Sequence, residues 1–130
     1  MSEVLGGMAA ALIGTIAIEL AVVALLGGRS ARELAAVALV NAITNPILNL
    51  ALLLVRLEVL PSVGAGLAAP VEWAFIGVAE IAVVLVEWRL LAWALRADSR
   101  TWLIRSAVMN ATSFVLGSWL LALAQRALAG

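Results

Sequence analysis

The sequence predicts an all-α integral membrane protein, an antiparallel bundle of four transmembrane helices in which proline breaks the second helix. Its composition is 65% apolar and 12% charged, with a mean hydropathy of +1.16, whereas soluble domains are about half apolar and a quarter charged. A spanning helix needs about 20 apolar residues. The chain, expected to be a single transmembrane domain over 1–130, offers four such stretches, at about 4–26, 34–57, 71–95 and 103–128.

Three short segments separate the apolar stretches. Residues 27–30 and 96–100 combine glycine or small residues with charged ones, and 58–70 contains two prolines and two glycines. Such clusters mark turns, and short connections make consecutive helices antiparallel neighbours. The apolar content of 58–70 leaves open whether this segment stays at the surface or re-enters the membrane.

The arginines give the expected orientation, because cytoplasmic loops collect Lys and Arg. Five flank the first and third turns, namely Arg29, Arg32, Arg96, Arg100 and Arg105. Two lie at the opposite ends of the helices, namely Arg56 and Arg126. The arginines therefore predict that both termini are external. The membrane expected for the protein is a prokaryotic inner membrane.

The composition also excludes several kinds of chemistry. The chain has no Cys, His or Tyr, so it has no thiolate or imidazole metal ligands and no phenol for acid-base work. Its formal net charge of +0 lacks the basic excess of a nucleic-acid-binding protein. We expect no cofactor, no metal site and no nucleic-acid partner.

The first expected span carries a carboxylate beside a ridge of small residues. An ionisable group in the hydrocarbon core costs from about 2.5 to more than 10 kcal/mol, so it normally faces the protein interior and marks function. Glu19 is such a group, although it could also pair with an Arg at the cytoplasmic end. Gly6, Ala10 and Gly14 form a surface suited to close helix contact, and a homodimer or a larger membrane complex is expected.

The second span contains three carboxamides at intervals of four residues, Asn41, Asn45 and Asn49, together with Pro46. Proline donates no hydrogen bond to the carbonyl of Ala42 and disfavours helical geometry in the preceding residue, so the helix is expected to kink or open here. Broken helices near the membrane midplane recur where ions or substrates bind. The alternative is a proline kink that serves helix packing alone.

The third and fourth spans extend this polar set. Glu72, Glu80 and Glu87 fall within an arc of about 80° on the third span, from the periodicity of an α-helix. Glu72 is a terminal residue, whereas Glu80 is expected to be the central carboxyl with Glu87 nearer the cytoplasm. In the fourth span Asn110 belongs to a stripe of polar and small residues.

The expected ion or substrate pathway therefore contains Glu19, Asn41, Asn45, Pro46, Glu80, Glu87 and Asn110. Oxygen ligands suit protons and hard cations, so one hypothesis is a proton- or cation-coupled transporter or channel. A second is an accessory or scaffolding subunit whose polar stripes pair with a larger membrane protein. A third, the least favoured, is an intramembrane enzyme, because no nucleophile motif is recognised.

Overall fold

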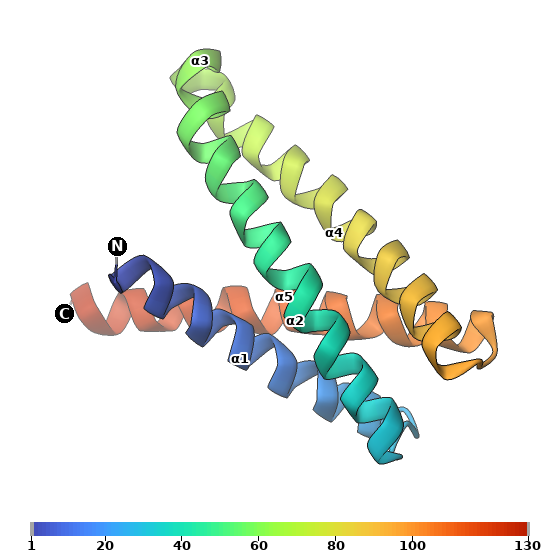
Figure 1. Cartoon of the computed structure of the whole chain (residues 1–130). Helices are drawn as coiled ribbons and strands as arrows, with labels where there is room; N and C mark the ends of the chain where they lie inside the picture. Colours follow the sequence, from blue (N-terminus) through green and yellow to red (C-terminus); the bar gives the residue numbers. More distant parts are fainter. Residues whose placement is uncertain (1, 130) are drawn as a thin grey trace.

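The computed structural model describes the backbone of residues 2–129 and the side chains of residues 6–7, 9–119 and 126 (Figure 1). Every element in this part of the chain is helical, which confirms the all-α fold. The four long helices are α1 (Ser2–Leu25), α2 (Ala31–Leu54), α4 (Ala65–Leu95) and α5 (Ser99–Ala129). Between α2 and α4 lie a π-helical turn, η1 (Val55–Val59), and a short helix, α3 (Leu60–Val63).

The helices form two hairpins, α1–α2 and α4–α5. Helix α1 packs against α2 and α5, and α4 packs against α5 and α2, so that the four helices form a ring. Both hairpin turns lie at one end of the molecule, which we call the closed end (Figure 1). At the other end, the open end, α2 and α4 diverge from α1 and α5 and are joined through α3. The arrangement is compatible with a four-helix bundle.

Both hairpin turns begin with the same helix-ending geometry. After α1, Gly27 adopts a φ of 90° and the Gly28 N–H donates to the carbonyl of Val23 at 2.9 Å. After α4, Arg96 adopts a φ of 50° and the Ala97 N–H reaches back across the same number of residues at 3.2 Å. These are Schellman-type ends, which satisfy the last carbonyls of a helix.

Each returning helix begins with a side-chain cap. Ser30 and Glu33 form a capping box at the start of α2, and Asp98 accepts from the Thr101 N–H at 2.7 Å at the start of α5. The Ser30 hydroxyl holds the pKa of the Glu33 carboxyl below its ordinary value, and the Thr101 hydroxyl does the same for the pKa of Asp98. Caps of this kind stabilise a helix by about 1 kcal/mol.

The expected break at Pro46 is wrong, because α2 is continuous from residue 31 to 54 with Pro46 inside it. Pro46 removes one hydrogen bond to Ala42, but the next turn is held by Asn49, whose side chain donates to the Asn45 carbonyl at 3.0 Å. One lost hydrogen bond costs a helix a few kcal/mol and need not end it. The irregular backbone lies further on, in η1.

The segment 58–70, expected to be a turn, is almost entirely helical. Gly64, with a φ of 79°, separates α3 from α4 and is the one residue where the helices are interrupted here. Pro61 lies in α3, which continues α2 through η1 as one helical segment, Ala31–Val63. A single glycine therefore provides the turn for which a longer linker was expected.

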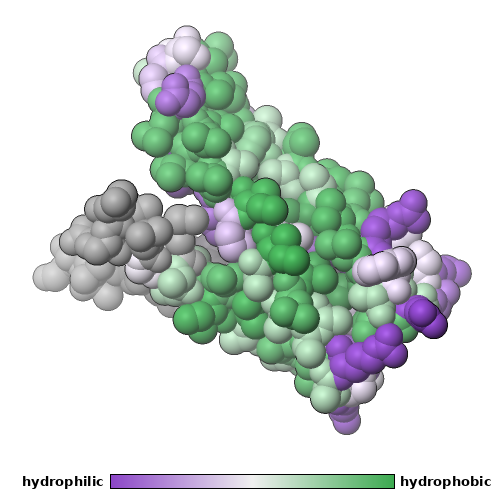
Figure 2. All heavy atoms as spheres, in the orientation of Figure 1, coloured by the Kyte–Doolittle hydropathy of each residue, from purple (hydrophilic) through white to green (hydrophobic). Residues whose placement is uncertain are grey.

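The apolar side chains lie mostly on the outside. Two helical segments, Ala31–Val63 and Ala65–Leu95, are long and apolar enough to cross a membrane, with mean hydropathies of 1.8 and 1.9. Only 22% and 0% of their most apolar stretches are buried, whereas the core helix of a soluble protein is mostly buried. Figure 2 shows a broad apolar surface with hydrophilic residues at the closed end and at the opposite tip near α3. This distribution supports a membrane location.

Candidate functional site

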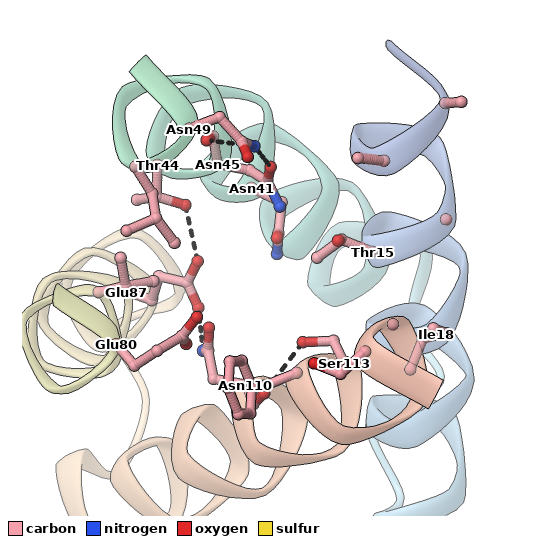
Figure 3. Close-up of a pocket in the computed structure, with 18 of the residues that line it drawn as sticks. Thr15, Ile18, Asn41, Thr44, Asn45, Asn49, Glu80, Glu87, Asn110 and Ser113 are labelled. Atoms are coloured by element: carbon pink, nitrogen blue, oxygen red, sulfur yellow. Dashed lines mark hydrogen bonds between the residues drawn. The ribbon is translucent and has the colours of Figure 1, made fainter. Parts of the chain in front are cut away.

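A cleft of about 640 Å³ opens where α1 and α5 diverge from α2 and α4, and all four long helices line it. Small residues of α1 form one wall, Gly7, Ala10, Ala11 and Gly14. Asn45 and Asn49 of α2, Glu80 of α4 and Phe114 of α5 contribute to the others. Figure 3 shows Asn41, Thr44, Glu87, Asn110 and Ser113 facing this space. We call the hydrogen-bonded set of Glu19 and these five residues the polar floor.

The first carboxyl group of the polar floor belongs to Glu19 of α1, which is fully buried. Its Oε2 accepts a hydrogen bond from Nδ2 of Asn41 at 2.5 Å, and its Oε1 accepts one from Oγ of Ser113 at 3.0 Å. Asn41 is on α2, in the same hairpin, and Ser113 is on α5, in the other hairpin. Glu19 therefore joins three helices. An ion pair with Arg, the alternative considered for Glu19, is not what the structure contains.

The second carboxyl group belongs to Glu87 of α4, which is 1% exposed. Its Oε2 accepts from Nδ2 of Asn110 at 2.5 Å, and its Oε1 accepts from Oγ1 of Thr44 at 2.7 Å (Figure 3). Asn110 comes from the same hairpin and Thr44 from the other one. Glu87 therefore repeats the arrangement around Glu19, with the helices exchanged.

The two amides are held in place by their own helices. Nδ2 of Asn41 also donates to the carbonyl of Val37 at 3.3 Å, and Nδ2 of Asn110 donates to that of Ser106 at 3.0 Å. Both hydrogens of each amide group are therefore used. No buried side-chain nitrogen or oxygen in the described residues lacks a hydrogen-bond partner, so the polar floor is a satisfied network, as buried polar groups require.

No arginine takes part in the polar floor. Arg105 lies at the closed end, where it donates to Glu33 at 3.0 Å and to the carbonyl of Leu26 at 3.2 Å. Glu19 and Glu87 are hydrogen-bonded only to neutral donors. Two acidic groups are therefore buried within one network without a countercharge of the described chain bound to them.

Of the remaining predicted residues, Glu80 and Asn45 line the cleft, whereas Pro46 is not among the lining residues. Glu80 is partly buried and borders the cleft, outside the hydrogen-bonded network of the described residues, so the network centres on Glu19 and Glu87 instead of on Glu80. Asn45 accepts from Nδ2 of Asn49 at 2.6 Å on the α2 wall. Pro46 follows Asn45 in unbroken helix. The structure thus brings four of the predicted residues together in the polar floor: Glu19, Asn41, Glu87 and Asn110. It leaves Asn45, Pro46 and Glu80 outside this network.

Two members of the polar floor, Thr44 and Ser113, were not among the predicted site residues. A signal for both exists, because each hydroxyl lies three residues after the asparagine that bonds a carboxyl. The recurrence of Asn, Ala, any residue and then Thr or Ser in α2 and α5 would have identified them.

The donor set limits the ligands that this network can hold. Each carboxyl oxygen already accepts a hydrogen bond, and no group of three potential metal-binding acidic side chains occurs in the described residues. A proton needs no such cage, because a carboxyl oxygen binds it directly. Carboxyl groups bonded by amides and hydroxyls, as in the polar floor, are able to bind and release protons.

The comparisons with known proteins identify no relative: the chain matches no family model, and neither a curated protein nor a solved structure is significantly similar to it.

Proposed function

We propose that the chain is an integral membrane protein with four spans and both termini external, and that it transports a solute coupled to protons bound at Glu19 and Glu87. The membrane assignment is supported by the exposed apolar helices. The orientation is supported by the arginines at the closed end, since cytoplasmic ends collect basic residues. In this orientation the cleft opens to the outside.

The observation that carries the transport proposal is the position of the two carboxyl groups. They are buried where the hairpins meet, and the residues that bond them line an open cleft. Interhelical hydrogen bonds in membranes contribute only about 0.6 to 2 kcal/mol each, whereas a charged side chain at depth costs more. Packing alone therefore gives a weak reason to keep two acids here.

The fold also offers a way for protons to affect the cleft. Each carboxyl group bonds one amide, Asn41 for Glu19 and Asn110 for Glu87, that joins the pair of α1 and α5 to the pair of α2 and α4. A change in the charge of the carboxyl group therefore alters a contact between the two pairs of helices. At the closed end the two hairpins are tied together by arginine contacts, whereas at the open end α1 and α5 diverge from α2 and α4 (Figure 1). A proton at the floor thus acts at the junction on which the width of the cleft depends.

Proton binding can be tested without knowing the solute. The full chain is reconstituted in vesicles on a solid-supported membrane, and pH steps are applied while the transient current is recorded. We expect a current in the wild type that is lost in Glu87→Gln. The matched control is Glu58→Gln, the same chemical change at an exposed carboxyl in η1. A wild type without any pH-driven current, or an unchanged Glu87→Gln, would contradict the proposal.

A second candidate, an accessory subunit or a homodimer, is favoured by one observation. Gly7 and Gly14 line the cleft on α1, and a Cβ atom added to either would meet no other atom within 4 Å. Small residues of this kind let a helix of another chain approach closely. Under this alternative, the pH-driven current is absent from the isolated chain and appears only when a partner is reconstituted with it.

A further inference from the structure

The polar floor is made of one motif used twice. In the first hairpin, Glu19 precedes Asn41 by 22 residues, and Thr44 lies three residues after Asn41. In the second hairpin, Glu87 precedes Asn110 by 23 residues and Ser113 follows in the same way. Both asparagines are followed by alanine and then by one other residue before the hydroxyl.

The two hairpins also match where no site chemistry is involved. Both first helices end in the same Schellman-type geometry, with one residue at positive φ, Gly27 or Arg96. Four residues after each glutamate, Val23 and Leu91 are buried in the core, at 0% and 1% exposure. A shared turn and a shared core position indicate that the resemblance covers the hairpins as wholes.

The contacts between the hairpins are reciprocal as well. At the closed end, Arg105 of α5 donates to the carbonyl of Leu26 just after α1, and Arg32 of α2 donates to the carbonyl of Ala94 near the end of α4 at 2.9 Å. Each second helix thus caps the first helix of the other hairpin. The ring of helix contacts has the same symmetry, because α1 and α4 each touch both α2 and α5.

We propose that the chain is an internal duplication of one helical hairpin, and that Glu19 and Glu87 are equivalent proton sites, each completed by a hydroxyl of the opposite half. This inference rests on the proposed function for its use of protons and deepens it by assigning two sites in place of one. It also assigns positioning roles to Thr44 and Ser113.

The hydroxyl groups explain how a site accepts a proton without losing its hydrogen bonds. Oγ1 of Thr44 lies 2.7 Å from Oε1 of Glu87 and 3.1 Å from the carbonyl of Val40. A hydroxyl has one hydrogen but can also accept. With Glu87 ionised, Thr44 donates to it. With Glu87 protonated, the carboxyl donates to Thr44, which turns its hydrogen to Val40.

Ser113 has the same two choices at the other site. Its Oγ lies 3.0 Å from Oε1 of Glu19 and 3.1 Å from the carbonyl of Asn110. Both protonation states of each carboxyl group are therefore fully hydrogen-bonded, and the direction of one bond between the hairpins reports which state is present. Because Asn110 itself bonds Glu87, the Ser113 hydroxyl also connects the two sites.

The ionisable groups that face these sites are few. In the described residues, the acidic side chains that line the cleft are Glu87 and Glu80, both on α4. Helices α2 and α5 supply amides and hydroxyls to the floor. Neighbouring acids make the binding of one proton sensitive to the other. Two sites that differ only in which half supplies the carboxyl should therefore titrate as a coupled pair.

Infrared spectroscopy of the full chain tests whether each carboxyl group is bonded by a hydroxyl group of the opposite half. The signal is the carbonyl stretch of a protonated carboxyl group, followed from acidic to alkaline pH and assigned with Glu19→Gln and Glu87→Gln. We expect Thr44→Val to shift the band of Glu87 and leave that of Glu19, and Ser113→Ala to do the reverse. Thr44→Ser and Ser113→Thr keep the hydroxyl and should restore each band. Thr112→Val, one residue from Ser113, is the matched control.

The opposite assignment would overturn the proposal. If Thr44→Val shifts the band of Glu19, each carboxyl group is bonded by a hydroxyl of its own hairpin and not by one of the opposite hairpin. If Glu19 and Glu87 show no protonated band at any pH, or titrate without reference to one another, they are not a pair of proton sites. If the spectra follow the expected pattern but the protein shows no pH-driven current, the proposal of two equivalent proton sites holds and the proposal of transport is wrong.

Discussion

The two hairpins are alike at the polar floor and at the closed end but differ along the walls of the cleft. Seven residues before the shared glutamate, α1 has Leu12 and α4 has Glu80. Four residues after the shared asparagine, α2 has Asn45 and α5 has Phe114. The proposed proton sites are therefore common to both halves, and the residues proposed to select a solute belong to one half each.

The largest expected effect comes from removing either carboxyl group. If the halves are equivalent, Glu19→Gln and Glu87→Gln should reduce the pH-driven charge movement to the same extent, by at least about tenfold, which corresponds to about 1.4 kcal/mol. The double variant should be little worse than either one, because groups that act as a unit are not additive. A tenfold difference between the two single variants would show that the halves have separate roles.

The next effect concerns the proline that distinguishes α2 from α5. Five residues after the shared asparagine, α2 has Pro46 and α5 has Val115. Since α2 is already continuous there, Pro46→Ala should restore one hydrogen bond and raise the free energy of unfolding by about 1 to 3 kcal/mol. Thermal unfolding measures this change. Loss of stability would show that the proline imposes a bend on which packing depends.

A smaller effect is expected at Glu80, where the halves differ in charge. Glu80→Leu makes α4 resemble α1 at this position and removes a carboxyl that the polar floor does not use. We expect a gain of about 1 kcal/mol in the free energy of unfolding, because an unpaired acid in apolar surroundings is replaced. The infrared bands of Glu19 and Glu87 should persist. Their disappearance would place Glu80 inside the proton site.

The smallest effect is at the closed end, where Glu33 of the first hairpin bonds Arg105 of the second. The Ser30 hydroxyl and Arg105 hold the pKa of Glu33 below its ordinary value. A lowered pKa contributes stability above the pKa of the unfolded chain, and this contribution is lost as the pH falls through the folded pKa. In Glu33→Gln the melting temperature should therefore decline less on acidification than in the wild type. An identical decline of the melting temperature in both proteins would show that Glu33 does not contribute to stability in this way.

The helices and most of the floor residues are predictable from the sequence. Apolar stretches of sufficient length give the long helices, and an acid or amide within such a stretch must face the protein interior. Glu19, Asn41, Glu87 and Asn110 were identified on that basis. Their pairing was not, because it depends on how the hairpins are rotated against each other, which the spacing along one helix does not determine.

Other features could not be read from one helix at a time. Glu80 was expected to be central from its depth in the third span, yet depth does not say which neighbour lies opposite. The break expected at Pro46 ignored the side-chain bonds that hold the following turn, such as that of Asn49. Thr44 and Ser113 are informative only when α2 and α5 are compared, because each serves the glutamate of the other hairpin.

The most direct test of the exchanged sites is a pair of double-mutant cycles on the free energy of unfolding. Thr44→Val is combined with Glu87→Gln, its partner in the other hairpin, and separately with Glu19→Gln, the acid of its own hairpin. We expect a coupling of about 0.6 to 2 kcal/mol in the first cycle, the range for interhelical hydrogen bonds in membranes, and near-additivity in the second. Coupling to Glu19 with none to Glu87 would contradict the account.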